Sequence, residues 1–181
     1  MDELTIERIN NERQRYVDFF AKTIDTLKAD KETFATELPI KVNDLSIPEP
    51  FDIIRVDFIY KNENGEHAMS EIRLSDNLKY DRLNVKIKGS EVSIRPFCWN
   101  SCEITGDYVD KEGLKNWVYK WIKIDNEMAG QVSEAIHSCT FPNHNKFNVD
   151  FGTSKGLALL DLIDTLTATG TKKLIIETSV V

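Results

Sequence analysis

Four charged residues on two neighbouring predicted strands are the first candidates for chemistry. Pairing the apolar faces of those strands places Asp57 opposite Glu71, and the same register places Arg55 opposite Arg73. Opposed carboxylates have Cβ atoms ~5 Å apart, close enough to share a proton or to hold a hard cation. Each carboxylate also has an arginine on its diagonal, which relieves the repulsion between like charges. The pattern therefore predicts a surface checkerboard of ion pairs. A metal- or phosphate-dependent hydrolase that uses Asp57 and Glu71 is the alternative.

Three cysteines and two histidines form a second candidate set. Cys98 and Cys102 have a spacing within the loose range of zinc sites, and Cys139 lies close in sequence to His137 and His144. However, Cys98 and Cys102 adjoin a predicted strand, where a buried thiol acts as a small apolar group. No family signature of a Cys–His nucleophile surrounds any of the three. We therefore expect unpaired structural thiols, no bound metal and no cofactor.

A third candidate is the run Gly152-Thr153-Ser154-Lys155-Gly156, which joins a predicted strand to a predicted helix. Free N–H groups at the start of a helix bind anions readily, so this run is a candidate phosphate site. It lacks the Gly-x4-Gly-Lys-Ser/Thr pattern of nucleotide hydrolases. The simpler interpretation is a helix start capped by Thr153 or Ser154, with Lys155 in water.

The stretch from Asp150 to Leu160, with the helix and strand that follow it, resembles the Asp-Ser-Ser-Gly-Leu region of anti-sigma-factor-antagonist domains. This resemblance is confined to the C-terminal strand, helix and strand. The hairpins predicted upstream do not fit the order of elements in that family.

The N-terminal part of the chain is predicted to be one amphipathic helix followed by a connection. Apolar residues at helical spacing indicate a helix over residues 3–29, whose first turns are poor in apolar residues and are expected to project. Covering this apolar stripe requires either the protein's own sheet or a second copy of the helix. Residues 30–50 contain three of the five prolines and are predicted to hold at most one short strand, near Ile40–Val42.

Two hairpins are predicted in the middle of the chain from period-2 alternation of apolar residues. The first pairs residues 52–60 with 68–74 through the three-residue loop 63–65, because a two-residue loop would turn one apolar face outward. The second folds around a two-residue type II′ turn at Gly89-Ser90.

The C-terminal part is predicted to be helical and then β-α-β. An apolar stripe with two tryptophans indicates a helix over 111–123 that covers a sheet, and residues 127–141 fit either a helix or a strand. The end of the chain is predicted to form two parallel strands, 146–151 and 173–178, joined by a helix over 154–168.

Together these elements predict an α+β fold. We expect an antiparallel sheet of four to five strands, covered on one face by helices, with a C-terminal β-α-β unit that extends or abuts it. The expected organisation is an N-terminal helix and connecting segment over 1–50 and a single α+β domain over 51–181.

Composition narrows the classes of function. The chain is 41% apolar and 29% charged, and its formal charge of −7 argues against binding to nucleic acid. The apolar runs are too short to cross a bilayer, no leader sequence is evident, and the odd number of cysteines fits a reducing compartment. We therefore expect a soluble, cytoplasmic protein that binds neither nucleic acid nor membrane.

The sequence favours binding over catalysis, because no nucleophile, base and oxyanion donor are seen to converge. We expect a non-catalytic protein-binding module of regulatory, chaperone-like or immunity (inhibitor) type. Its partner is expected to be another protein, and the chain itself a monomer or a homodimer through the N-terminal helix. The predicted contact surface combines charge with a large apolar group and consists of Arg55, Arg73, Arg95 and Phe97.

Overall fold

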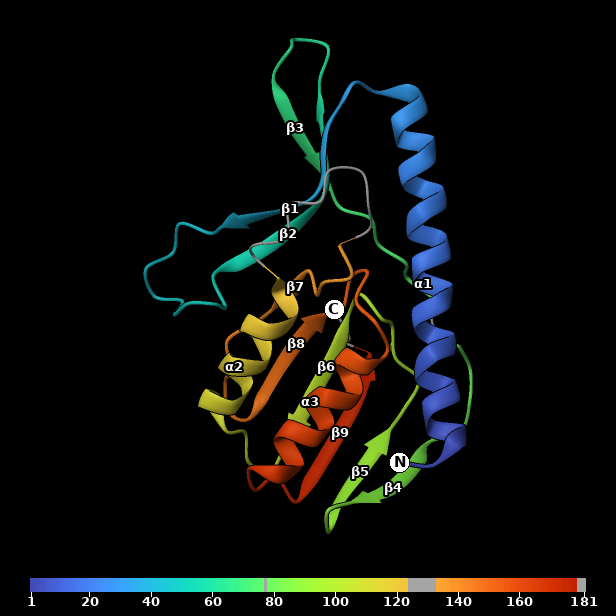
Figure 1. The fold of residues 1–181 in the computed structure, drawn as a ribbon, viewed down its shortest axis with the longest axis vertical. Coiled ribbons are helices and arrows are strands. Elements are labelled where there is room, and N and C mark those ends of the chain that lie inside the picture. Colours follow the sequence, from blue (N-terminus) through green and yellow to red (C-terminus); the bar gives the residue numbers. More distant parts are fainter. Residues whose placement is uncertain (77, 124–132, 179–181) are drawn as a thin grey trace.

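The structure is a computed structural model that describes residues 1–76, 78–123 and 133–178. These residues form three helices and two β-sheets, and the smaller sheet projects from a body built on the larger one (Figure 1). The helices are α1 (Glu3–Asp30), α2 (Lys111–Ile122) and α3 (Leu157–Ala168). The antiparallel three-stranded sheet consists, in order, of β1 (Thr33–Lys41), β2 (Ile53–Lys61) and β3 (His67–Ser70). The six-stranded sheet consists, in order, of β4 (Leu83–Ile87), β5 (Ser90–Ile94), β9 (Lys173–Thr178), β6 (Cys102–Gly106), β8 (Lys146–Asp150) and β7 (Ser138–Cys139).

The α+β class is confirmed, but the prediction of one antiparallel sheet with four to five strands is wrong. The two hairpins belong to different sheets: β2 pairs with both β1 and β3, whereas β4 and β5 join the C-terminal unit. The larger sheet is mixed, because β5 and β9 are parallel. Alternation in a sequence indicates which face of a strand is buried, and it carries no information about which other strand lies at its edge.

The first hairpin has the predicted register. Phe58 pairs with Ser70 and Lys61 pairs with His67, which leaves the predicted three-residue loop with Gly65 at a φ of 78°. A positive φ at the last loop position is the geometry that glycine favours in such loops. The second strand is shorter than expected, because β3 ends at Ser70 and the chain then leaves the ladder.

The second hairpin differs from the prediction by a two-residue shift in pairing. Ile87 pairs with Ser90, so the turn residues are Lys88 and Gly89, with φ values of 51° and 83°. Two central residues with positive φ define a type I′ turn, not the predicted type II′ turn at Gly89-Ser90. A shift of two residues keeps every side chain on its own face, so alternation could not separate the two registers.

The observed register makes Ser90 a buried strand residue whose hydroxyl donates a hydrogen bond to the Thr171 carbonyl at 2.6 Å. We expect Ser90→Ala to lower the free energy of unfolding by about 1 kcal/mol, because the carbonyl loses its partner. Urea unfolding followed by circular dichroism would measure this, with the partly buried Ser138→Ala as the control. A type II′ turn would place Ser90 in a loop, and the substitution would then have no measurable effect.

The C-terminal strand-helix-strand unit is present with the predicted direction of its strands. Because β8 and β9 both run antiparallel to β6, they are parallel to each other, and β6 lies between them. The strand β6 was not predicted, since its five residues carry only a short alternation. The predicted cap of α3 is wrong: the helix begins at Leu157 after Gly156, and Thr153 and Ser154 are buried in the loop before it.

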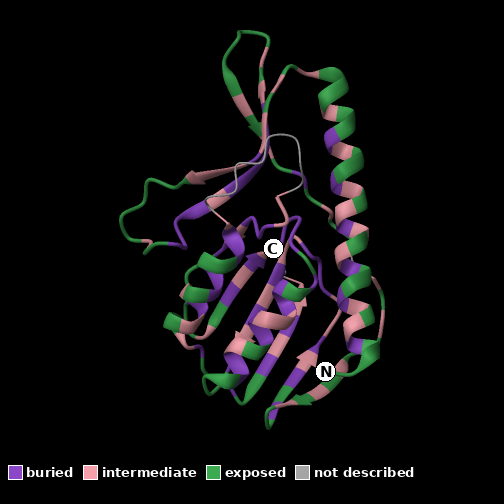
Figure 2. Cartoon of the chain, viewed as in Figure 1, coloured by how far each residue is buried: buried purple, intermediate pink, exposed green. Residues whose placement is uncertain are grey.

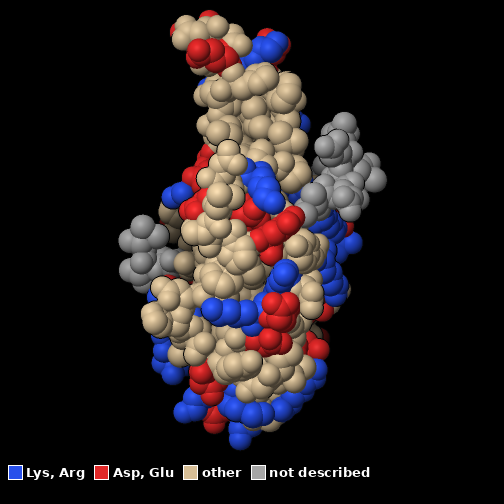
Figure 3. Space-filling view, turned by 90° about the vertical axis from the view of Figure 1, so that its left-hand side faces the viewer, with Lys and Arg blue, Asp and Glu red and all other residues tan. Residues whose placement is uncertain are grey.

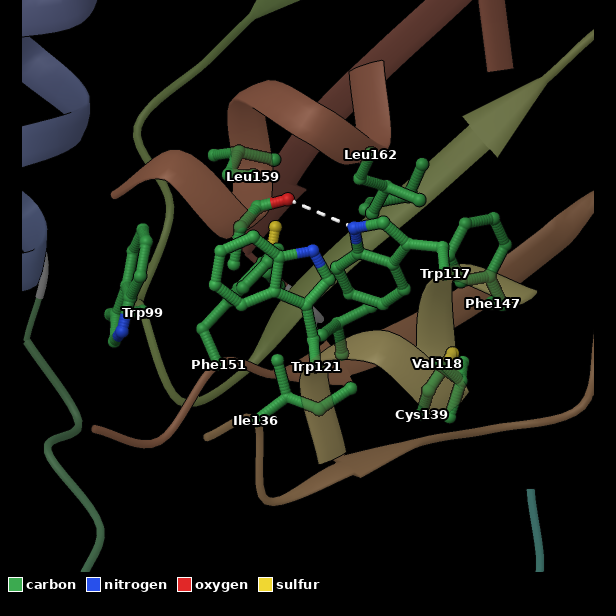
Figure 4. Packing of buried hydrophobic residues seen from close by; sticks show 14 of the residues in the cluster. Trp99, Trp117, Val118, Trp121, Ile136, Cys139, Phe147, Phe151, Leu159 and Leu162 are labelled. Carbon is green, nitrogen blue, oxygen red and sulfur yellow. Dashed lines mark hydrogen bonds between the residues drawn. The ribbon is translucent and has the colours of Figure 1, made fainter. Parts of the chain in front are cut away.

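The core lies between the six-stranded sheet and the two short helices, which cover one face of it (Figures 1 and 2). The predicted helix α2 and its Asp110 cap are confirmed, and its tryptophans point into the core (Figure 4). The indole N–H of Trp117 donates to the Ala158 carbonyl at 3.0 Å, which ties α2 to α3. Phe151 packs against Trp117 and Trp99 from the end of β8.

The predicted N-terminal helix is confirmed as α1, which lies along one side of the molecule (Figure 1). Its apolar stripe is covered by the chain itself, and the expectation that its first turns project is wrong because Ile9 is fully buried. Polar contacts fix the same turns: Glu12 accepts from the Leu78 N–H at 2.6 Å, and the Arg13 guanidinium donates to the Ser154 carbonyl at 2.8 Å. The strand after α1 extends over nine residues and is much longer than the predicted Ile40–Val42.

Candidate functional site

A cluster of buried charged residues lies where the two sheets meet. Glu37 comes from β1, Asp57 from β2 and His137 from the segment just before β7. The side chain of His137 is only 2% exposed, and those of the two acids are 5–6% exposed. Charged groups at this depth need partners, because burial without them carries a large desolvation penalty.

His137 lies between the two carboxylates. Its Nε2 is 3.0 Å from Glu37 Oε1, within hydrogen-bonding distance, and its Nδ1 is 2.7 Å from Asp57 Oδ1. The Nδ1 contact has the distance of an ion pair without the alignment of a hydrogen bond. The other Asp57 oxygen accepts from the Ile72 N–H at 2.5 Å. Phe20 of α1 packs its ring against the imidazole edge, with centroids 5.7 Å apart.

The Glu37 carboxylate is the most heavily hydrogen-bonded group of the cluster. Besides His137, it accepts from the Ser133 N–H at 2.9 Å, from the Ser133 hydroxyl at 2.7 Å and from the Thr153 hydroxyl. Thr153 belongs to the loop that sequence analysis considered for phosphate. The loop hydroxyl is therefore committed to an internal carboxylate.

Arg55 of β2 anchors the cluster to the body. Its guanidinium donates to the carbonyls of Glu37, Ile122 and Lys123, at 2.6 Å and 2.8 Å for the first two. Its backbone N–H donates to the His137 carbonyl at 2.7 Å. These bonds join β2 to the end of α2 and to the segment that carries His137.

Electrostatics in the cluster favour the charged forms of the paired groups. Burial alone lowers the pKa of His137, but the contacts with Asp57 and Glu37 raise it to about 10. Burial alone raises the pKa of Glu37, but the bonds from His137, Thr153 and Ser133 hold it well below its usual range. At neutral pH these shifts favour the imidazolium form of His137 and the carboxylate form of Glu37. Burial also raises the pKa of the neighbouring Asp150 to about 7.

The backbone is adapted to this arrangement at two positions. Glu37 has a φ of 51° in the middle of a strand, a conformation that non-glycine residues rarely adopt. Gly152 has a φ of 48°, and a Cβ there would lie 2.0 Å from the His137 ring. Residues held in such conformations cost free energy and persist only where the surroundings over-determine them.

The predicted pairing of Asp57 with Glu71 is wrong. Asp57 is buried against His137, whereas Glu71 is 70% exposed and pairs with the 72% exposed Arg73 at 2.7 Å. The predicted checkerboard also fails at Arg55, which is buried and bonded to carbonyl groups. The pairing of β2 with β3 ends at Ser70, so Glu71 does not lie opposite Asp57 as the register predicted.

The four predicted binding residues do not share one exposed face. Arg55 and Phe97 are buried, whereas Arg73 is exposed and follows β3. Arg95 directly follows β5 in the larger sheet and pairs with Glu177 at 2.5 Å. The prediction assumed that every residue opposite the apolar face of a hairpin meets solvent. The segment before β7 covers that side of β2.

The remaining candidates are dispersed or enclosed. Cys98, Cys102 and Cys139 are free and buried, and burial raises their pKa values. Within the described ranges, no group of three or more His, Cys, Asp or Glu side chains is arranged to hold a metal ion. The start of α3 is covered by α1, since a Cβ on Gly156 would lie 2.3 Å from the Asn10 side chain.

Sequence reasoning missed Glu37 and assigned His137 no specific role. The available signals were the charged residue within an apolar strand around Ile40 and a histidine in the stretch 127–141, of which residues 127–132 lie outside the described residues. Neither signal identifies a partner 100 residues away.

In the described part of the chain, no helix is long and apolar enough to span a membrane. Comparison of the chain with protein-family models, with curated proteins and with solved structures finds no match.

Proposed function

We propose that this chain is a non-catalytic protein-binding module of regulatory, chaperone-like or inhibitor type, and that its three-stranded sheet contacts the partner. One observation carries the proposal. The sheet projects from the body (Figure 1). It exposes large apolar side chains where a solvated sheet would carry polar ones. Exposed apolar area of this kind is typical of protein interfaces.

The exposed apolar groups gather on the outer part of this sheet. Phe34 of β1 is 56% exposed and Met69 of β3 is 64% exposed. The Phe34 ring meets the His67 ring across the central strand, with centroids 4.2 Å apart. Figure 3 shows that, below a charged tip, the projecting part presents an area almost free of charged residues. Arg73, which follows β3 and is 72% exposed, is the predicted binding residue that we retain as part of the contact.

The acid–histidine cluster supports the same choice of function. Its carboxylates, imidazole and hydroxyls are bonded to one another, and they join the two sheets. Their arrangement is that of a structural junction, which positions the projecting sheet relative to the body.

The test uses the double substitution Phe34→Ser and Met69→Ser in the tagged full-length chain. We expect a protein that co-purifies with the unmodified chain from its native host to be lost from the variant, since exposed apolar anchors dominate such interfaces. The protein identified by mass spectrometry is then purified, and its affinity for both chains is measured by calorimetry. We expect affinity to fall at least ~tenfold, the equivalent of about 1.4 kcal/mol.

The matched control is Tyr119→Ser with Leu157→Ser, which removes two exposed apolar groups from the helices of the body. Equal losses in both variants would contradict a specific role for the sheet. Light scattering measures whether the chain forms a homodimer. A homodimer that depends on Phe34 and Met69 would assign the surface to a second copy of this chain and would overturn the proposal of a different partner.

A further inference from the structure

A groove of about 460 Å³ lies on the open face of the six-stranded sheet, opposite the helices, where β4, β5 and β9 run side by side. Its size falls within the range of ligand sites. Among the side chains that line it are four cations, Arg82, Lys86, Arg95 and Lys173, and one carboxylate, Glu91. A cationic groove is unexpected in a chain with a formal charge of −7.

The register explains how the groove forms. One row across the strands holds Lys86, Glu91 and Lys173, and the next row, ~7 Å along the strands, holds Asn84, Ser93 and Ile175. Long side chains in the outer row therefore stand beside shorter ones in the middle row.

Arg82 and Arg95 close the other side of the groove, so that its floor is lined by the shorter side chains and its walls are charged. Side chains on the same face of neighbouring strands line up in this way because the strands alternate with period two.

Two polar atoms at the groove lack a partner in the part of the chain that the structure describes. They are the Arg95 Nε and the Ser93 hydroxyl, both of which are themselves buried. The Arg95 Nη1 is bound to Glu177 at 2.5 Å, whereas the Nε of the same guanidinium has no acceptor among the described residues. Buried donors are normally satisfied, and an anionic acceptor satisfies donors of this kind with charge-assisted hydrogen bonds.

We infer that this groove binds an acidic, extended peptide segment of a partner protein, with its carboxylates at the Arg82–Arg95 wall and the Lys86–Lys173 wall. In an extended segment, side chains on one face recur every ~7 Å, which matches the spacing between rows of the sheet. The site is separate from the three-stranded sheet and does not depend on the function proposed for it.

The observations favour a peptide over a nucleic acid. Among the residues that the structure describes, no aromatic side chain lines the groove, whereas proteins that bind single strands stack bases on aromatic rings. The overall negative charge repels a long phosphate backbone. Individual carboxylates on a flexible segment can reach each cation while avoiding Glu91 and Glu177.

The test is fluorescence polarisation with a labelled, end-capped hexaglutamate peptide and the full-length chain at low salt. We expect binding that weakens as salt is added, because exposed charge pairs are screened. The pair Lys86→Gln and Lys173→Gln should weaken it by ~tenfold or more. The control pair Lys115→Gln and Lys120→Gln removes the same charge from α2 and should leave it unchanged.

A second variant separates a shaped site from general attraction. Ser93→Leu fills the middle of the groove without changing charge, and we expect it to abolish binding, whereas circular dichroism should show an unchanged fold. Binding that survives Ser93→Leu, or that falls equally in the control pair, would overturn the inference. Tighter binding of a labelled dodecathymidylate than of hexaglutamate would assign the groove to nucleic acid instead.

Discussion

Replacing His137 by alanine is expected to lower the free energy of unfolding by about 3–5 kcal/mol. The substitution removes the only imidazole that contacts both Glu37 and Asp57 among the described residues, and it leaves both carboxylates buried. Removing one partner from a buried ion pair is costly because the remaining charge can be neither solvated nor paired. Urea unfolding at pH 6, followed by circular dichroism and tryptophan fluorescence, would measure the loss.

Two companion variants identify the cause. His144→Ala removes an exposed histidine and should change the stability little. In a chain that already carries Glu37→Gln and Asp57→Asn, His137→Ala should cost much less, because the uncompensated charges are gone and only the cavity remains. A similar loss in both backgrounds would mean that the cluster contributes packing and no net electrostatic stabilisation.

The second large effect is a fall in stability as the pH rises above about 6.5. The pKa of His137 is raised in the folded chain, so its stabilisation is complete below the unfolded value of 6.5 and is lost as the pH rises through the folded value of about 10. One proton bound more tightly by the folded state gives a slope of up to about 1.4 kcal/mol per pH unit. Asp150, whose pKa is raised to about 7, adds a fall between its usual value of 3.8 and pH 7.

Glu37 acts in the opposite direction. Its pKa is lowered, so its stabilisation is present above 4.5 and is lost as the pH falls below that value. The profiles of unfolding free energy for the wild type and His137→Gln, measured between pH 8 and 10, isolate the histidine because the other titrating groups are common to both chains. We expect the difference between the two profiles to shrink as the pH rises. A difference that stays constant over this interval would show that His137 is neutral in the folded chain.

Local pattern was enough to predict most of the individual elements. The tryptophan stripe of α2 and the alternation of β5 correspond to buried faces, since both depend on neighbours a few residues away. The first hairpin could be placed in register because a two-residue loop would have turned one of its apolar faces outward. The second could not, because Lys88-Gly89 and Gly89-Ser90 leave the same faces buried.

Long-range arrangement was beyond the same reasoning. The division into two sheets depends on which strand edges meet, and the pairing of β5 with β9 joins residues far apart in the sequence. The buried cluster was missed for the same reason. Charged residues such as Arg55 and Asp57 are usually solvated on a half-buried strand, and only the covering segment with His137 makes them internal.

The order of synthesis gives the junction at His137 a further consequence. Glu37 and Asp57 emerge from the ribosome well before His137, since Glu37 precedes it by 100 residues. At ~5–20 residues per second, β1 to β3 exist for several seconds before their imidazole is available. Until then, the two carboxylates favour solvent, and Arg55, whose acceptors on Ile122 and Lys123 are made earlier, is the charged contact of the cluster with the body. The junction is therefore completed late, after the segment before β7 has been made, so that a chain truncated before His137 would lack the imidazole between its two carboxylates.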